Sequence, residues 1–113
     1  RLELEELEAM LQRHGFRTDG STTFEEAETK LRNNHYAAVV ADFHLPAGRD
    51  GSRRDGVHLL EVAREVSPLS VRILFTADPM GATLAELVGG VWISKGADYA
   101  IAVVRAIREG LER

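Results

Sequence analysis

The stretch that decides the fold is Ala37–Pro46, which reads Ala-Ala-Val-Val-Ala-Asp-Phe-His-Leu-Pro. It opens with five small or β-branched apolar residues, and turn-forming residues follow it. A short apolar run bounded by turns predicts a strand buried on both faces, as in a parallel sheet. The run ends at Asp42, and ligands of open α/β sheets bind just past the carboxyl ends of the strands. Asp42 is therefore a candidate site residue, although an aspartate at a strand end can also simply begin a turn.

The composition is that of an ordinary globular protein of 113 residues, with 44% hydrophobic and 28% charged residues. We expect one domain over residues 1–113, belonging to a longer polypeptide. The formal charge of −4 argues against a nucleic-acid-binding face. The chain has no cysteine, and no apolar run has the length of a membrane span, so we expect a cytoplasmic protein.

Outside the opening stretch, apolar residues at helical spacing alternate with short apolar runs. Helices are predicted at Leu2–Phe16, 23–34, Val57–Val66, 79–88 and from Asp98 to the end. Strands are predicted at Ala37–Phe43, Val71–Phe75 and Val91–Ile93, with a weak edge strand at Arg17–Thr23. This alternation predicts an α/β fold, in which a doubly wound parallel sheet carries helices on both faces.

Local signals mark where several of the helices begin and end. Gly15 fits the end of the first helix, and Thr23 with Glu26 three residues later forms a capping box for the second. Asp98 is expected to cap the last helix, whose buried stripe is expected to run from Ile101 to Leu111.

Three polar residues each follow a predicted strand: Asp42, Thr76 and Lys95. Because the carboxyl ends of parallel strands lie at one edge of the sheet, we expect these side chains to converge. A carboxylate can act as a nucleophile toward a phosphoryl group, and a hydroxyl can donate to a phosphoryl oxygen. An ammonium group can neutralise the added charge. Taken singly, Thr76 could bond its own backbone and Lys95 could be a solvated charge.

From Leu2 to Leu111 the chain resembles the receiver domain of a two-component response regulator. The resemblance rests on Val39–Asp42 with Pro46 four residues later, on Asp55-Gly56 at a helix start, and on Ile73–Ala77, Ile93–Lys95 and Val104–Arg108. It implies a flavodoxin-like, three-layer α/β/α fold. It also implies that Asp42 is the phosphoacceptor, that Thr76 turns toward the phosphoryl oxygens and that Lys95 pairs with them.

The same resemblance implies further residues and partners. Trp92 stands where the family carries its switch aromatic, and the backbone carbonyl of His44 would be a ligand of Mg²⁺ together with Asp42. A histidine kinase or phosphotransfer protein would donate the phosphoryl group, and an output domain or partner protein would respond. A homodimer is compatible with this role. The domain itself would bind neither nucleic acid nor membrane and would not be an enzyme.

The chain departs from the family at its start. The family begins with a central apolar strand that ends in an acidic pair holding Mg²⁺, whereas this chain opens almost directly in a helix. Two explanations compete: an upstream segment precedes Arg1 in the natural protein, or Arg1–Leu4 is a degenerate strand and Glu5-Glu6 replace the acidic pair. Without an acidic pair Mg²⁺ would bind weakly. Because a missing central strand would leave backbone groups unpaired, we expect another segment or a partner chain to fill the gap.

Other functions remain open on the residues alone. A haloacid-dehalogenase-type phosphatase needs a second acid two residues after the first, where this chain has His44. A cobalamin-binding module carries Asp-x-His, but the following glycine is off by one position here. The main alternative is a pseudo-receiver that works as an interaction module without phosphorylation.

Overall fold

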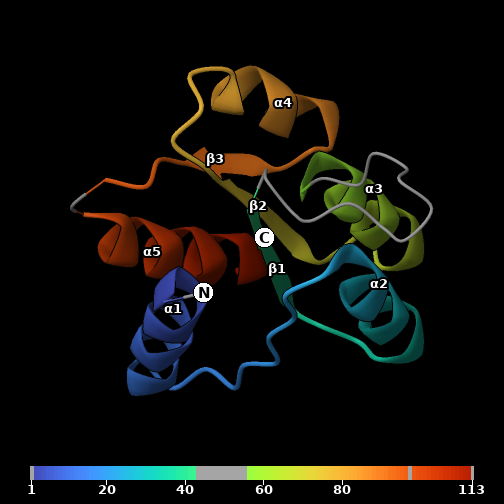
Figure 1. Cartoon of the computed structure of the whole chain (residues 1–113), viewed down its shortest axis with the longest axis horizontal. Helices are drawn as coiled ribbons and strands as arrows, with labels where there is room; N and C mark the ends of the chain where they lie inside the picture. The colour runs from blue at the N-terminus through green and yellow to red at the C-terminus, as the bar shows by residue number, and fades with distance from the viewer. Residues whose placement is uncertain (1, 43–55, 97, 113) are drawn as a thin grey trace.

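A parallel sheet with helices on both of its faces forms the centre of the molecule (Figure 1). The structure is a computed structural model that describes residues 2–42, 56–96 and 98–112. Its helices are α1 (Leu2–Arg13), α2 (Phe24–Asn33), α3 (Gly56–Val66), α4 (Gly81–Leu87) and α5 (Tyr99–Leu111). Its strands are β1 (Ala38–Asp42), β2 (Val71–Phe75) and β3 (Val91–Ile93). The predicted alternation of strands and helices and the α/β/α fold class are therefore confirmed.

The described strands lie in the order β1-β2-β3, and each neighbouring pair is parallel. Asp42 is level with Phe75, and Phe75 is level with Ile93, so the carboxyl ends of the strands form one edge. The strands are rich in β-branched residues, which pack well on a pleated surface that helices cover.

The sheet separates two hydrophobic layers. On one face, Leu74 and Ala41 pack with buried residues of α2, α3 and α4, including Phe24 and Leu60. On the other face, Ile73, Phe75 and Ile93 pack with buried residues of α1 and α5, which are Leu7, Met10, Leu11, Val103, Val104 and Ile107. Successive strand residues alternate between the two layers, as the two-residue period of a strand requires.

Two of the predicted helix signals are confirmed by the backbone geometry. Gly15 has a positive φ of 90°, and the Phe16 amide donates to the Leu11 carbonyl, which closes the end of α1. At the start of α2, the Glu26 amide donates to the Thr23 hydroxyl at 3.3 Å. The Glu26 carboxylate accepts from the amide of Thr22 rather than from that of Thr23.

The predicted edge strand at Arg17–Thr23 is wrong, because this segment joins no ladder in the structure. Its side chains bond to the neighbouring elements instead. Asp19 accepts from the Lys30 ammonium at 2.7 Å and from the Tyr36 hydroxyl at 2.6 Å, and Thr18 accepts from the Gln12 amide. Polar side chains thus hold the segment in place without sheet pairing.

Several expectations about the ends of elements and their buried faces were also wrong. Residues 2–4 begin α1, which overturns the reading of Arg1–Leu4 as a degenerate strand. The fourth helix begins at Gly81 rather than at Pro79, and Asp98 makes no side-chain capping bond. Ile101, expected on the buried stripe of the last helix, is 63% exposed because it lies on the outer side of α5.

Candidate functional site

Asp42 and Lys95 meet at the carboxyl edge of the sheet. The Lys95 Nζ lies 2.6 Å from the Asp42 Oδ2, and the two residues are 53 positions apart in sequence. The strands bring them together, since Asp42 ends β1 and Lys95 follows β3 by two residues. The Asp42 side chain is 33% exposed and that of Lys95 is 20% exposed, so a solute can approach the pair from the solvent side.

Phe75 forms the floor between these two charged residues. It is the last residue of β2, the strand between β1 and β3, and its register partners are Asp42 and Ile93. The Lys95 ammonium lies 5.5 Å from the centre of the Phe75 ring, within the range of a cation–π contact. Tyr99 also packs against Phe75, with its ring centre 5.2 Å from that of Phe75. The ammonium is therefore held over an aromatic surface while it contacts the carboxylate.

Thr76 lies at the same edge but is engaged in its own turn. The residue is 1% exposed, and its hydroxyl accepts a hydrogen bond from the Asp78 amide at 3.1 Å. The Thr76 amide donates to the Ile93 carbonyl at 3.2 Å, which continues the β2–β3 ladder by one residue. The hydroxyl thus bonds to a nearby backbone group, which is common for threonine at turns. Its predicted contact with a phosphoryl group stays a prediction.

Trp92 is tied to Thr76 through the backbone. The indole Nε1 donates to the Thr76 carbonyl at 3.0 Å, and the ring is half-buried. Gly81 at the start of α4 makes this position available, since a Cβ there would lie 2.2 Å from the Trp92 Nε1. The structure therefore connects Thr76, the indole and the first turn of α4 through direct contacts.

Asp78 and Gly81 were not singled out as site residues in the sequence. Asp78 accepts from the Met80 amide at 2.8 Å, so it shapes the turn between Thr76 and α4. The local signal was present, because aspartate before proline favours such a turn. The role of Gly81 had no local signal, since it depends on a tryptophan that lies eleven residues later and on the neighbouring strand.

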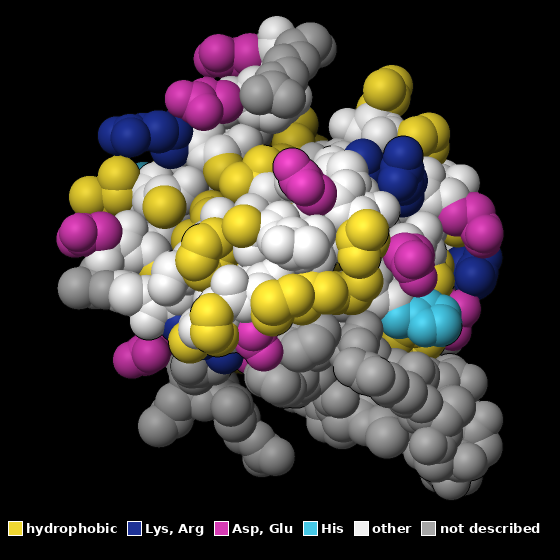
Figure 2. All heavy atoms as spheres, turned by 90° about the horizontal axis from the view of Figure 1, so that it is seen from above, with side chains coloured by type: hydrophobic (Ala, Val, Ile, Leu, Met, Phe, Trp, Pro, Cys, Tyr) yellow, Lys and Arg dark blue, Asp and Glu magenta, His cyan; other side chains and the backbone are white. Residues whose placement is uncertain are grey.

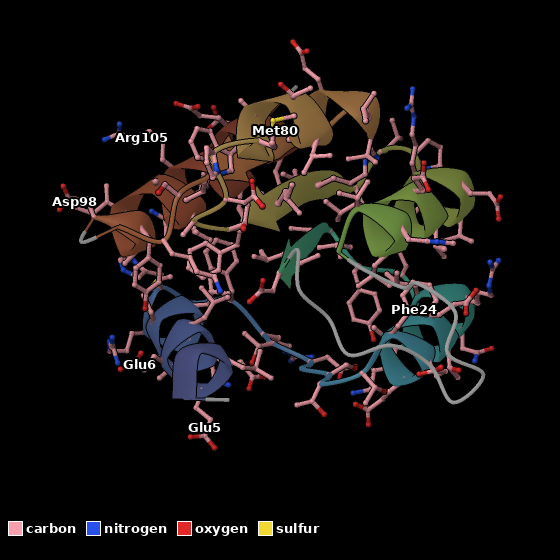
Figure 3. All side chains as sticks on the ribbon, turned by 45° about the horizontal axis from the view of Figure 1, so that its top comes forward. Glu5, Glu6, Phe24, Met80, Asp98 and Arg105 are labelled. Carbon is pink, nitrogen blue, oxygen red and sulfur yellow. The ribbon has the colours of Figure 1, made fainter. Side chains whose placement is uncertain are left out.

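The described residues do not by themselves form a Mg²⁺ site. They hold no cluster of three or more acidic or histidine side chains. Glu5 and Glu6 are exposed on α1 and point outward, away from the sheet (Figure 3). His44, whose carbonyl was expected to be a ligand, lies outside the described residues. Mg²⁺ needs near-octahedral oxygen ligands, and of the predicted ligands the described residues supply only Asp42.

Searches of protein-family models and of curated proteins found no match. In the described part of the chain, no helix is long and apolar enough to cross a membrane. The solved structures, in contrast, include many similar folds.

The receiver domain of a response regulator from Methanospirillum hungatei has a TM-score of 0.82 at 21% identity, and the match covers 98% of this chain and 86% of that one. A response regulator receiver protein from Sinorhizobium medicae has a TM-score of 0.84 at 18% identity, with 99% and 87% covered. The beryllofluoride-activated NtrC4 receiver domain, solved as a dimer, has a TM-score of 0.75 at 27% identity, with 96% and 90% covered. The fold expected from the family resemblance is therefore confirmed.

Proposed function

Since its fold is that of response-regulator receiver domains, we propose that this chain is a phosphoacceptor signalling module that is phosphorylated on Asp42. The observation that carries the proposal is the 2.6 Å pair of Asp42 and Lys95 at the carboxyl edge of the sheet. The donor would be a phosphohistidine of a histidine kinase or phosphotransfer protein. The response would be read by an output domain or a partner protein, so the module would signal rather than turn over a substrate.

In the proposed step, a carboxylate oxygen of Asp42 attacks the phosphorus atom. A new P–O bond forms as the bond between phosphorus and the donor nitrogen or oxygen breaks, and the donor keeps that electron pair. The product is an acyl phosphate that carries nearly two negative charges, about one more than the carboxylate it replaces. The Lys95 ammonium is placed to move from the carboxylate to the phosphoryl oxygens, which would stabilise this charge.

Thr76 and Trp92 would transmit the change caused by phosphorylation of Asp42 to helix α4 on the surface. In the proposed switch, the Thr76 hydroxyl would turn toward a phosphoryl oxygen and give up the hydrogen bond that it accepts from the Asp78 amide. A shift of Thr76 also moves the carbonyl that holds the Trp92 indole, and the indole contacts α4 at Gly81. Phosphorylation would thereby favour one of two arrangements of α4 and β3, with a coupling free energy of about 1–3 kcal/mol.

The surface over α4 and β3 is the face proposed to meet a partner. Figure 2 shows hydrophobic side chains gathered on this side of the molecule. Its exposed apolar residues are Met80 and Leu87 of the α4 region and Val91 of β3. An apolar surface is typical of a site of protein association, and a homodimer or an output domain could cover it.

The proposal is tested with acetyl phosphate and Mg²⁺, followed by intact-mass measurement. We expect the wild-type chain to gain the mass of one phosphoryl group, which hydroxylamine then removes, and Asp42→Asn to gain none. Asp98→Asn is the matched control, because Asp98 is an exposed carboxylate before α5 that makes no capping bond (Figure 3). Equal labelling of wild type and Asp42→Asn would refute the proposal.

The second candidate is an interaction module that works without phosphorylation. It is favoured by the incomplete set of Mg²⁺ ligands among the described residues. If the wild-type chain takes up no phosphoryl group while a partner still binds the α4–β3 face, this second function would replace the first.

A further inference from the structure

The Phe75 side chain lies on the same side of the sheet as both charged residues of the candidate site. Asp42 and Phe75 are level across β1 and β2, and Phe75 is level with Ile93 of β3. Phe75 and Ile93 both pack in the layer of α1 and α5. Because side chains alternate between the two faces of a strand, Lys95 returns to this side two residues after Ile93. The register of the strands thus places Phe75 beside both charged groups.

The Lys95 ammonium contacts one charged and one uncharged group. Its ion pair with Asp42 depends on a carboxylate that is ionised and unmodified. Its contact with Phe75, at 5.5 Å from the ring centre, arises from the quadrupole of the ring and needs no charge on the partner. The contact with the ring is therefore the one that does not depend on the chemical state of Asp42.

Solvent weakens the ion pair more than it weakens the contact with the ring. The paired side chains are 33% and 20% exposed, and water screens an ion pair of this exposure. The flexible stem of lysine also loses conformational freedom when a single pair fixes it. Phe75, in contrast, is only 6% exposed, and a cation–π contact becomes stronger where water is excluded.

Tyr99 connects the aromatic ring to the turn that carries Lys95. Its ring centre lies 5.2 Å from that of Phe75. Its backbone amide donates to the carbonyl of Gly96, the residue after Lys95, at 3.3 Å. Tyr99 is also the first residue of α5, so the start of this helix contacts both the ring and the turn. These contacts keep the ring and the ammonium group in a fixed relative position.

We propose that Phe75 is a positioning residue that holds the Lys95 ammonium at the carboxyl edge of the sheet independently of the charge on Asp42. The ammonium is then in place before a phosphoryl group arrives and stays there after the carboxylate is modified. The inference rests on the proposed function and adds to it the residue that positions Lys95. A leucine at position 75 would fill the apolar layer but would offer no aromatic face to the ammonium.

The reactivity of the lysine amines tests the proposal, because Lys30 and Lys95 are the two lysines of the chain. Acetylation by sulfo-N-hydroxysuccinimide acetate at fixed pH, followed by peptide mass spectrometry, gives a rate for each amine. Only the neutral amine reacts, so a contact that stabilises the ammonium slows the reaction. We expect Phe75→Leu to raise the rate at Lys95 about fivefold, both in the wild-type chain and in the Asp42→Asn background. Lys30, which pairs with Asp19, is the internal reference and should not change.

Ile73→Val is the matched control variant. Ile73 is fully buried in the same layer and on the same strand as Phe75, so its truncation loosens the core without removing the ring. The acetylation rate at Lys95 should stay at the wild-type value. The inference would be overturned by an unchanged Lys95 rate in Phe75→Leu, by an equal increase in Ile73→Val, or by an effect that disappears in the Asp42→Asn background.

Phosphoryl uptake from acetyl phosphate shows whether this position matters for the proposed reaction. We expect Phe75→Leu to take up the phosphoryl group about fivefold more slowly than the wild-type chain, and Ile73→Val to match the wild type. Equal uptake by Phe75→Leu and wild type would refute the role of Phe75 and leave the proposed function intact. No uptake by the wild-type chain would refute the proposed function, and the acetylation rates would still decide what holds Lys95.

Discussion

The Tyr36 hydroxyl connects the polar segment before α2 to the start of β1. It donates to the Asp19 carboxylate at 2.6 Å, and Lys30 donates to the same carboxylate at 2.7 Å. Burial, with the bond to the Asp19 carboxylate as the second cause, raises the pKa of Tyr36 from 10.0 to about 12. The bond to Lys30, followed by that to Tyr36, lowers the pKa of Asp19 below its usual 3.8. This small network takes the place of the predicted sheet pairing.

The raised pKa of Tyr36 predicts a loss of stability in alkali. A group whose pKa is higher in the folded chain than in the unfolded chain stabilises the fold. For Tyr36 this stabilisation is complete when the pH is below the unfolded pKa of 10.0, and it is lost as the pH rises toward the folded pKa of about 12. We expect the free energy of unfolding from urea titrations to decline across this window in the wild-type chain. In Tyr36→Phe the part of the decline due to this phenol should be absent. An unchanged decline in Tyr36→Phe would assign the effect to other groups.

At the scale of elements, the packing of α4 on β3 depends on the contact between Gly81 and Trp92. A Cβ at position 81 would come within 2.2 Å of the indole nitrogen, which is the same atom that donates to the Thr76 carbonyl, so a side chain there would force the ring to shift. Glycine is needed here for close approach rather than for backbone conformation, since Gly15 and Gly89 are the described residues with positive φ. The close packing of α4 on β3 therefore depends on the absence of a side chain at position 81.

Gly81→Ala is expected to displace the indole and to lower the free energy of unfolding by about 1–3 kcal/mol. Trp92 is the only tryptophan of the chain, so its fluorescence should shift to longer wavelength as the ring becomes more solvated. Gly96→Ala is the control, because a Cβ there meets nothing within 4 Å. Identical emission spectra for Gly81→Ala and wild type would show that the ring keeps its position.

At the scale of the whole molecule, Arg72 joins turns at the amino edge of the sheet that belong to different connections. Its guanidinium donates to the Pro68 and Ser70 carbonyls before β2 and to the Val88 and Gly89 carbonyls after α4. Burial lowers the pKa of Arg72, and the nearby Arg64 adds to this effect. One side chain thus holds both the entry to β2 and the exit from α4.

Arg72→Met is expected to lower the free energy of unfolding by about 2 kcal/mol, since four carbonyls lose their donor and two of these hydrogen bonds are partly buried. Arg72→Lys should restore little of the loss, because an ammonium group cannot span the positions that the planar guanidinium reaches. Urea denaturation measures both variants. The exposed Arg105 provides the control (Figure 3), and Arg105→Met should change stability by no more than about 0.5 kcal/mol. A full rescue by lysine would mean that charge, rather than the bond geometry, matters.

Much of the fold could be predicted because its signals are local. The apolar runs at Val71–Phe75 and Val91–Ile93 marked strands, and the Thr23–Glu26 signal marked a helix start, all within a few residues of chain. Asp42 and Lys95 could be placed at one edge because parallel strands share their carboxyl ends, and the structure brings them to 2.6 Å. The edge strand at Arg17–Thr23 failed as a prediction because side-chain bonds to other elements replaced the ladder.

The sequence by itself determined the order of helices and strands and the edge of the sheet that carries the charged pair, since periodicity and strand direction are written in neighbouring residues. Only the tertiary structure decided that Trp92 rests against Gly81 and donates to the Thr76 carbonyl, and that Arg72 joins the turn before β2 to the turn after α4. These features depend on which distant segments become neighbours. Packing across the whole molecule determines which distant segments become neighbours, so no local sequence pattern predicts these contacts.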